Sequence, residues 1–241
     1  MKYGIISDIH SNLEAMRAVL QALQKSGVDA LLCLGDIVGY NADAKKCLDI
    51  VRDLNPVCVV GNHDLAVAGK LDPSHFTENG RQGVVFSRNQ LEFSDIEYIK
   101  QLPLKYHHRD FELVHGSLNQ PERFIYLNDI TKSQDTFYLM KSKVCFVGHT
   151  HKPQIYVNQG KTAAIAATLN LSLETDARYI VNTGSVGQPR DGDPRASFCV
   201  YDTDEETIEI KRVEYDVKTA QQKILQAGLP EKLALRLAVG S

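Results

Sequence analysis

Short apolar runs alternate with amphipathic stretches along the first quarter of the chain. The apolar runs at residues 3–7, 30–34 and 57–60 predict buried strands. Residues 11–25 and 43–53 are predicted to be helical; in the first of them, apolar residues recur at three- and four-residue spacing. This alternation favours right-handed βαβ units, an α/β fold and a largely parallel sheet.

The pattern changes over residues 65–103, which carry no strong strand signal. Residues 77–90 and 94–101 have helical patterns, with Ser94 as the expected N-cap and Pro103 as a stop. We therefore expect a helical insertion at about residues 65–103 that lies over the ends of the strands as a candidate lid.

Short strands dominate the predicted structure of the rest of the chain. They are expected at residues 105–108, 111–115, 123–126, 144–147, 154–158, 162–167, 179–182, 196–202 and 207–213. Their close spacing suggests antiparallel hairpins, and residues 217–239 are expected to form an outer helical segment interrupted at 228–230. Residues 1–241 show no linker or internal repeat, so we predict a single domain. An exposed edge strand after residue 160 could pair with a second copy of the chain, so a homo-oligomer is compatible with the sequence.

Composition narrows the class of protein. The formal net charge of the 241 residues is −3, and no basic block is present, so we expect no bulk binding of nucleic acid. The sequence runs directly into a strand after Met1 and has no apolar run of membrane-spanning length, which predicts a cytoplasmic protein without a membrane partner. The five cysteines show no CxxC spacing and are predicted to be free and reduced.

Five polar motifs follow predicted strands at their carboxyl ends, where α/β folds place ligands. The motifs are Asp8-Ile9-His10, Gly35-Asp36, Gly61-Asn62-His63-Asp64, His115-Gly116 and Gly148-His149-Thr150-His151. Asp, Asn and His are the ligands of a mixed oxygen and nitrogen dinuclear metal site, in which a carboxylate is able to bridge two ions. Each motif alone is compatible with turn chemistry or a structural histidine, but together, in this order, they predict a metal site.

Spacing within two of the motifs suggests how they would bind an ion. Residues two apart in an extended strand point to the same side, which would direct Asp8 and His10 toward one ion. His149 and His151 have the same spacing, and Gly148 permits close approach of the backbone.

The series DxH, GD, GNHD, H and GHxH, over residues 1–151, resembles the calcineurin-like metallophosphoesterase superfamily. Residues 7–12, 35–40 and 182–190 resemble more specifically its compact bacterial and archaeal phosphodiesterase-type members, which extends the similarity to nearly the whole chain. The sequence departs from the family pattern at Thr183, where proline is usual. The resemblance implies a four-layer α/β/β/α sandwich of two mixed sheets with outer helices.

The resemblance also implies two divalent ions. Their ligands would be Asp8, His10, Asp36 and His151 for one ion, and Asp36, Asn62, His115 and His149 for the other. Asp36 would then bridge them. Mixed nitrogen and oxygen ligands favour Mn²⁺, Fe or Zn²⁺ over Mg²⁺, and Mn²⁺ is the ion we expect to support activity in vitro.

The implied reaction is hydrolysis of a phosphoester bond by a hydroxide that bridges the two ions. His63 would stay off the metals and, oriented through Asp64, would protonate or hydrogen-bond the leaving oxygen.

Four further residues are expected to contact substrate. Asn12 and Tyr40 lie just past metal motifs, and the guanidinium groups of Arg190 and Arg195 would clamp a phosphate. Local Arg–Asp pairs in the intervening turn are an equally simple interpretation of the two arginines. We expect His75, His107 and His108 to be surface or strand residues outside the site.

The substrate stays open within the class of small, possibly nucleotide-type phosphoesters. A phosphodiesterase, a phosphatase, a dinucleoside polyphosphate hydrolase and a cyclic-nucleotide hydrolase all fit. Protein serine/threonine phosphatases of this superfamily carry a DRG element where this chain has Val-Gly-Tyr at residues 38–40. An alternative of another class is a non-catalytic scaffold of the same fold, like the small retromer subunit. The intact Gly61–Asp64 element, which includes His63, favours an enzyme.

Overall fold

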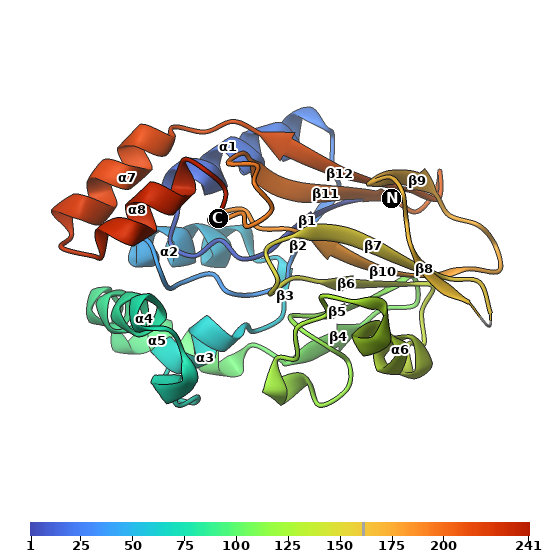
Figure 1. Ribbon diagram of the computed structural model, residues 1–241, viewed down its shortest axis with the longest axis horizontal. Coiled ribbons are helices and arrows are strands. Elements are labelled where there is room, and N and C mark those ends of the chain that lie inside the picture. The colour runs from blue at the N-terminus through green and yellow to red at the C-terminus, as the bar shows by residue number, and fades with distance from the viewer. Residues whose placement is uncertain (161) are drawn as a thin grey trace.

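Two six-stranded mixed sheets pack face to face in the computed structural model, which describes residues 1–160 and 162–241. Helices lie on the outer faces of the two sheets (Figure 1). The four-layer α/β/β/α sandwich expected from the sequence is therefore confirmed. The first sheet has the strand order β3 (Val57–Cys58), β2 (Ala30–Cys33), β1 (Lys2–Ile6), β11 (Ala196–Asp202), β12 (Thr207–Val213) and β9 (Asn170–Ser172). The second has the order β4 (Lys105–His107), β5 (Phe111–Val114), β6 (Val144–Val147), β10 (Arg178–Thr183), β7 (Pro153–Asn158) and β8 (Ala163–Ile165).

The first sheet is parallel only in part. β1, β2 and β3 are parallel neighbours, as their alternation with helices predicts. On its other side, however, β1 pairs antiparallel with β11, which forms a hairpin with β12. The expectation of a largely parallel sheet is therefore correct for the first three strands and wrong for the whole sheet.

Alternating side chains along the strands divide the core into layers. Ile5 of β1 packs between the two sheets with Phe111 and Phe146, whereas the next residue, Ile6, packs toward the helices on the outer face. Those helices are α1 (Leu13–Lys25) and α2 (Ala44–Leu54), close to their predicted positions. All five cysteines are free and buried, as expected of small apolar side chains.

The segment at 65–103 is helical, as predicted. It contains the end of α3 (Asn62–Val67), the 3₁₀ turn η1 (Pro73–His75), and the helices α4 (Glu78–Gln90) and α5 (Phe93–Gln101). Ser94 is not the N-cap of α5. The helix starts at Phe93 and its N-cap is Glu92, whose N–H donates to the Asp95 carboxylate at 3.0 Å.

One prediction for the second half of the chain is wrong, and two elements there were not predicted. Residues 123–126 do not form a strand, because the 3₁₀ turn η2 (Pro121–Arg123) leads into Phe124 with a left-handed backbone (φ 48°). The helix α6 (Ile130–Leu139) and the edge strand β9 were not predicted.

The C-terminal segment forms a helical hairpin of α7 (Val217–Gln226) and α8 (Glu231–Leu237), interrupted near residues 228–230 as predicted. β8 lies at the edge of the second sheet, where a strand must lie to pair with a second copy of the chain. A homo-oligomer stays a prediction. No helix among residues 1–160 and 162–241 is long and apolar enough to cross a membrane.

Candidate metal centre

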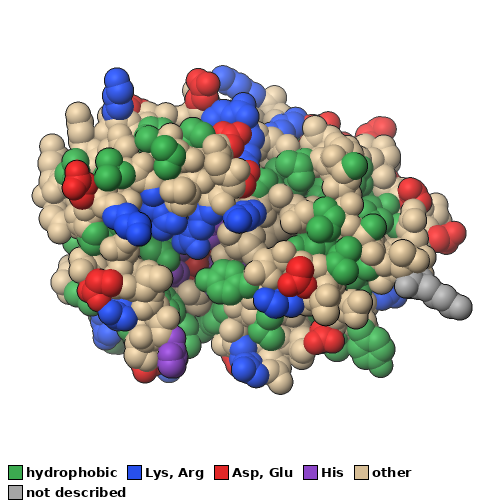
Figure 2. All heavy atoms as spheres, in the orientation of Figure 1, with side chains coloured by type: hydrophobic (Ala, Val, Ile, Leu, Met, Phe, Trp, Pro, Cys, Tyr) green, Lys and Arg blue, Asp and Glu red, His purple; other side chains and the backbone are tan. Residues whose placement is uncertain are grey.

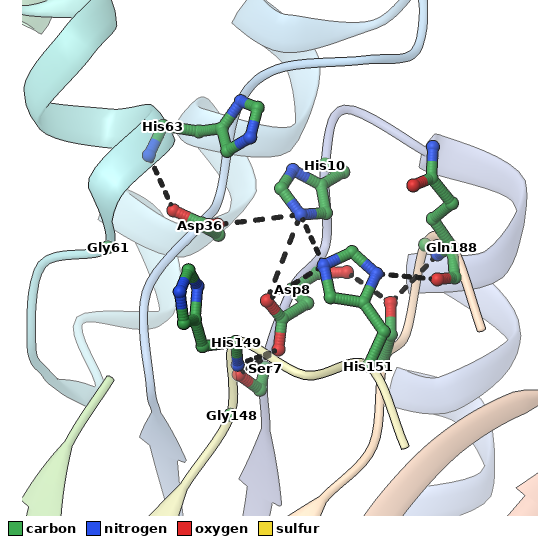
Figure 3. A network of polar contacts seen from close by, with 12 residues as sticks. Ser7, Asp8, His10, Asp36, Gly61, His63, Gly148, His149, His151 and Gln188 are labelled. Atoms are coloured by element: carbon green, nitrogen blue, oxygen red, sulfur yellow. Dashed lines mark hydrogen bonds and ion pairs between the residues drawn. The ribbon is translucent and has the colours of Figure 1, made fainter. Parts of the chain in front are cut away.

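All five polar motifs meet where strands of the two sheets end side by side. Asp8 follows β1, Asp36 follows β2, and Asn62 begins α3 just after β3. From the second sheet, His115 follows β5 and the His149–His151 motif follows β6. Figure 3 shows side chains from both sheets pointing toward one another. The sequence prediction that these motifs share one site therefore agrees with the geometry.

The local backbone differs from the extended conformation that the spacing suggested. Asp8, His10, Asp36, His149 and His151 all have positive φ angles, between 47° and 67°. Non-glycine residues rarely adopt this region, and such strain clusters at functional sites. Main-chain hydrogen bonds hold the turns, including Asp8 N to Gly35 O at 3.0 Å and His10 N to Asp36 O at 2.9 Å.

These turns distribute the side chains over overlapping clusters. Asp8, His10 and His151 place ligand atoms within 4.8 Å of one another, and so do Asp36, His115 and His149. His149 and His151 therefore serve different clusters, although extended spacing had suggested a common direction. A third group joins His10 and Asp36 to His63, so distance alone does not separate His63 from the ligands.

Short distances between ligand atoms connect the clusters. His10 Nε2 lies 3.0 Å from His151 Nε2, which is 3.3 Å from Asp8 Oδ1. Asp36 Oδ2 lies between two histidines, 3.2 Å from His115 Nε2 and 3.5 Å from His10 Nε2. Asp36 Oδ2 thus lies between a histidine of one cluster and a histidine of the other.

Main-chain carbonyls hold three of the imidazoles from behind. His10 Nδ1 is 3.1 Å from Val38 O, His115 Nδ1 is 2.7 Å from Leu34 O, and His151 Nδ1 is 2.6 Å from Gln188 O. A hydrogen bond from Nδ1–H to a carbonyl fixes the ring and leaves Nε2 free to bind a metal.

Each carboxylate is likewise anchored through one oxygen. Asp8 Oδ2 accepts from Ser7 Oγ at 2.6 Å and from His149 N at 3.0 Å (Figure 3). Asp36 Oδ1 accepts from His63 N at 2.8 Å. The second oxygen of each group therefore faces the centre.

Several buried atoms at the centre have no hydrogen-bond partner among the described residues. They are Asp8 Oδ1, Asn62 Oδ1, His115 Nε2 and His149 Nε2. Unpaired buried polar atoms are costly, and native structures normally satisfy them with a partner or an ion. Because these atoms are oxygen and nitrogen donors, the residues present fit divalent metal ions.

Electrostatics at the centre also favour a cation. Burial would raise the pKa values of Asp8 and Asp36, but nearby histidines outweigh it and lower both. Burial would lower the pKa of His115, but Asp36 and Asp8 raise it to about 10. Burial lowers the pKa of His10 and His149. Two ionised carboxylates beside the neutral imidazoles of His10 and His149 attract positive charge, and the raised pKa of His115 shows the same preference for a cation.

His63 is held by aromatic packing. Its ring centroid lies 4.4 Å from that of Tyr40 and 4.7 Å from that of Phe76, and burial lowers its pKa to about 4. Gly39 closes the other side: its φ is 98°, and a Cβ there would lie 2.6 Å from His63 Nδ1.

Asp64 does not orient His63 as expected. Its carboxylate accepts main-chain N–H groups of Ile37 (2.8 Å), Val38 (3.2 Å) and Gly61 (3.1 Å). Burial and the charge of Asp36 raise its pKa to about 7. Because its recorded hydrogen bonds go to the backbone, Asp64 joins the Asp36 turn to the start of α3.

A cavity of about 440 Å³ opens above the centre. It is lined by Tyr40, Asn62, His63, Leu71, Asp72, His75, Phe76, Thr77, Glu122, Arg123, Phe124, Tyr126, His149 and Arg190. Tyr40 and Arg190 therefore lie where a substrate contact is expected. His75, assigned to the surface from the sequence, also lines the cavity, whereas His107 and His108 lie at and just after β4, outside the lining.

The side chains of two expected substrate contacts, Asn12 and Arg195, bind other groups of the protein. Asn12 caps α1 by accepting from Ala15 N at 3.1 Å, and it donates to Gly187 O at 2.9 Å. Arg195 pairs with Asp193, with Nη2 2.7 Å from Oδ2. This is the local Arg–Asp pair that the turn-rich sequence left open.

Sequence reasoning missed the aromatic walls of the cavity. The ring of Tyr126 stacks on that of His149 at 3.7 Å, Phe124 lies nearby, and Phe76 stands on the other side against His63. Single aromatic residues in irregular segments carry no motif, so no sequence signal distinguished them from core residues.

The chain is similar to known proteins over its whole length. The family model described as the calcineurin-like phosphoesterase superfamily domain matches residues 1–206. An uncharacterized protein of Methanocaldococcus jannaschii is 38% identical, with 98% of this chain and 97% of that protein covered. A metallophosphoesterase from Sphaerobacter thermophilus is 36% identical, with a TM-score of 0.88 over 100% of this chain and 99% of that chain.

A further solved structure, with lower sequence identity, is similar to this chain in fold alone. A hypothetical protein from Pyrococcus horikoshii has 18% identity and a TM-score of 0.80, over 100% of this chain and 98% of that chain. Since the family match spans far more than half of the sequence, the chain belongs to the calcineurin-like phosphoesterase superfamily.

Proposed function

We propose that this protein is a phosphoesterase that uses two divalent metal ions to hydrolyse a small organic phosphoester. The observation that carries the proposal is the convergence of unpaired oxygen and nitrogen atoms from both sheets on one buried centre. Family membership supports the reaction class, since the superfamily is one of phosphoester hydrolases.

One ion would be held by Asp8, His10, His151 and Asp36, and the other by Asn62, His115, His149 and Asp36. The two clusters that separate His151 from His149 support this division. The position of Asp36 Oδ2 between His10 and His115 supports its role as the bridge. The mixed ligands favour Mn²⁺, Fe or Zn²⁺, and Mn²⁺ is the ion to test first.

When bound, two such ions supply Lewis acidity and lower the pKa of water, which makes a nucleophile available near neutral pH. The chain itself fixes the geometry. Carbonyls of Leu34, Val38 and Gln188 hold the ligand imidazoles from behind, so that little reorganisation accompanies the reaction.

His63 would assist the leaving group. It lines the cavity next to Asn62, and Tyr40 and Phe76 hold its ring. From this position the N–H of its neutral imidazole would donate a hydrogen bond to the leaving oxygen. Help of this kind contributes about 10²–10⁴ in rate.

The cavity supports a small substrate. Its volume of about 440 Å³ and its walls at residues 71–77 and 122–126 suit an organic group the size of a nucleotide better than the surface of a folded protein. The helical segment at 65–103 contributes the first of these walls and would act as the lid. Tyr126 and Phe76 would offer flat faces to an aromatic or nucleobase group.

Hydrolysis of bis-p-nitrophenyl phosphate and p-nitrophenyl phosphate, measured side by side with Mn²⁺, tests the proposal. We expect turnover that requires metal and falls about 10²-fold or more in His63→Ala at unchanged metal content. The preferred ester would identify a diesterase or a phosphatase. Absence of turnover by metal-loaded wild-type protein on both esters and on a panel of nucleotides, including dinucleoside polyphosphates, would favour a non-catalytic scaffold.

A further inference from the structure

The C-terminal helical hairpin packs against the candidate metal centre although it lies outside residues 1–206, the part that the family model matches. Tyr40 is buried in one hydrophobic cluster with Ile224 of α7 and Leu233 and Leu237 of α8. The same tyrosine ring contacts His63 and His10, with centroids 4.4 and 4.7 Å away. The hairpin is therefore part of the wall of the site.

The end of α8 is joined to the loop that follows Arg190. Gly192 N donates to Gly240 O at 2.9 Å, and a Cβ on Gly240 would lie 2.6 Å from the backbone of Asp193. This close approach places the C-terminal end of α8, which carries Arg236 in its last turn, beside the loop that follows Arg190. Arg236 lines an adjoining cavity of about 590 Å³, which shares Thr77 with the cavity above the metal centre.

Neither guanidinium has a side-chain carboxylate within ion-pair distance in the part of the chain that the structure describes. The Arg190 guanidinium lies 5.5 Å from the centre of the Tyr40 ring, and its Nε and Nη2 donate to Gln188 Oε1 at 3.3 and 2.8 Å. Arg236 donates through Nε to the main-chain oxygen of Ser241. Nη1 of Arg190 and both amino groups of Arg236 make no hydrogen bond to a described residue.

The charge of Arg190 acts on Arg236. Burial lowers the pKa of Arg236, and the charge of Arg190 lowers it further. Figure 2 shows Lys and Arg side chains gathered along one wall of the hollow in which a histidine is visible. Two half-buried arginines with free donors are the arrangement that binds a phosphate through charge-assisted, forked hydrogen bonds.

We propose that Arg236, together with Arg190, binds a second, non-scissile phosphate of the substrate. The inference rests on the proposed function, because the first phosphate would be the one at the metal centre. It names the substrate class: an organic phosphoester, such as a nucleotide, that carries at least one further phosphate.

A matched pair of substrates tests the inference. Thymidine 3′-(p-nitrophenyl phosphate), with and without a 5′-phosphate, differs only in the second phosphate. In wild type with Mn²⁺ we expect the 5′-phosphate to lower KM by about tenfold, as one charge-assisted contact would. Arg236→Gln should lose this preference, and Arg236→Lys should retain part of it.

Arg109→Gln is the control, since it removes the same charge from an exposed site at the far end of β5 from His115. Binding of thymidine 3′,5′-bisphosphate and thymidine 3′-monophosphate to the metal-loaded variants should be measured by calorimetry. Circular dichroism verifies that Arg236→Gln is folded.

The outcomes separate the two proposals. Equal preference for the second phosphate in wild type and Arg236→Gln, in binding as in KM, would overturn the inference and leave the phosphoesterase intact. Binding that requires Arg236, without hydrolysis of these diesters, of p-nitrophenyl phosphate or of the nucleotide panel, would overturn the proposed function and support the anion subsite.

Discussion

His10 and His151 direct their Nε2 atoms at each other across 3.0 Å, while a main-chain carbonyl binds the Nδ1 atom of each ring. With the proton on Nδ1, two nitrogen lone pairs face each other in a buried site, and burial lowers the pKa of both imidazoles. A cation between the rings relieves this repulsion, and protonation does so less well because burial disfavours the imidazolium.

We predict that Asp36→Asn disrupts both ion sites, because only Asp36 belongs to both proposed ligand sets. His151→Ala should reduce the Mn²⁺ content from two ions per chain to about one, whereas Asp36→Asn should reduce it further. Metal analysis after dialysis measures this difference. Equal metal content in the two variants would contradict the bridging role.

Metal should also stabilise the fold. An ion that binds only the native state adds about 2.7 kcal/mol to the free energy of unfolding when its concentration is 100 times Kd. Chelator should therefore lower the melting temperature of wild type, and the shift should be smaller in His151→Ala. A melting temperature insensitive to chelator and to added Mn²⁺ would argue against a bound ion.

Gly39→Ala should reduce activity without emptying the metal centre. The new Cβ would lie 2.6 Å from His63 Nδ1 and would displace the ring, while the ligands stay in place. We expect kcat to fall by about 10² because catalysis depends on the orientation of such groups. Gly27→Ala is the control, since Gly27 also has a positive φ (65°) but no atom near its Cβ position. Equal losses of activity in the two variants would contradict the prediction.

The ion pairs that attach α7 predict a pH dependence of stability. Burial would raise the pKa of Asp43, but hydrogen bonds from Lys223, at 2.7 Å, and Lys46 outweigh it and lower the pKa. Because the pKa is lower in the folded state, the stabilisation is present above the unfolded value near 3.9 and is lost as the pH falls further.

Urea unfolding with chelator, between pH 6 and about pH 2.5, measures this effect. Asp43→Asn should be about 1 kcal/mol less stable than wild type at pH 6, and the difference should shrink below about pH 4. Asp53→Asn, at an exposed position of α2, the helix that Asp43 precedes, should match wild type. A difference that is constant over the whole pH range would contradict the ion-pair explanation.

Tyr126 should contribute to substrate binding more than to the chemical step. Its ring stacks on His149 and lines the cavity, and 46% of the residue surface is exposed. Tyr126→Ala should raise KM for aryl or nucleotide esters several-fold, since an aromatic contact contributes about 0.5–1.5 kcal/mol. Tyr126→Phe should retain wild-type KM. A loss of kcat alone would instead indicate that Tyr126 positions His149.

The sequence predicted the location of the candidate site better than its local geometry. Buried strands such as 144–147 are recognisable from their apolar runs, and parallel neighbours bring their carboxyl ends together. The left-handed turns at Asp8 and His151 depend on main-chain contacts between distant segments, as in the hydrogen bond from Arg190 N to His151 O. Residue spacing contains no information about such contacts.

α6 illustrates why other elements were missed. Its buried face carries Ser133 and Thr136 beside Phe137, while Tyr138 and Leu139 are exposed. Polar residues therefore occupy buried positions of α6 and apolar residues occupy exposed ones. The sequence of α6 does not show the helical repeat of apolar residues that would predict it. Asn12 shows a related ambiguity: helix capping and substrate binding both use a polar residue after a motif, and the structure shows Asn12 as a cap.

Anomalous diffraction from crystals soaked with Mn²⁺ tests the central claim most directly. We predict two peaks on either side of Asp36, one in contact with Asp8, His10 and His151 and the other with Asn62, His115 and His149. A single peak, or no peak at these residues at millimolar Mn²⁺, would contradict a two-ion centre.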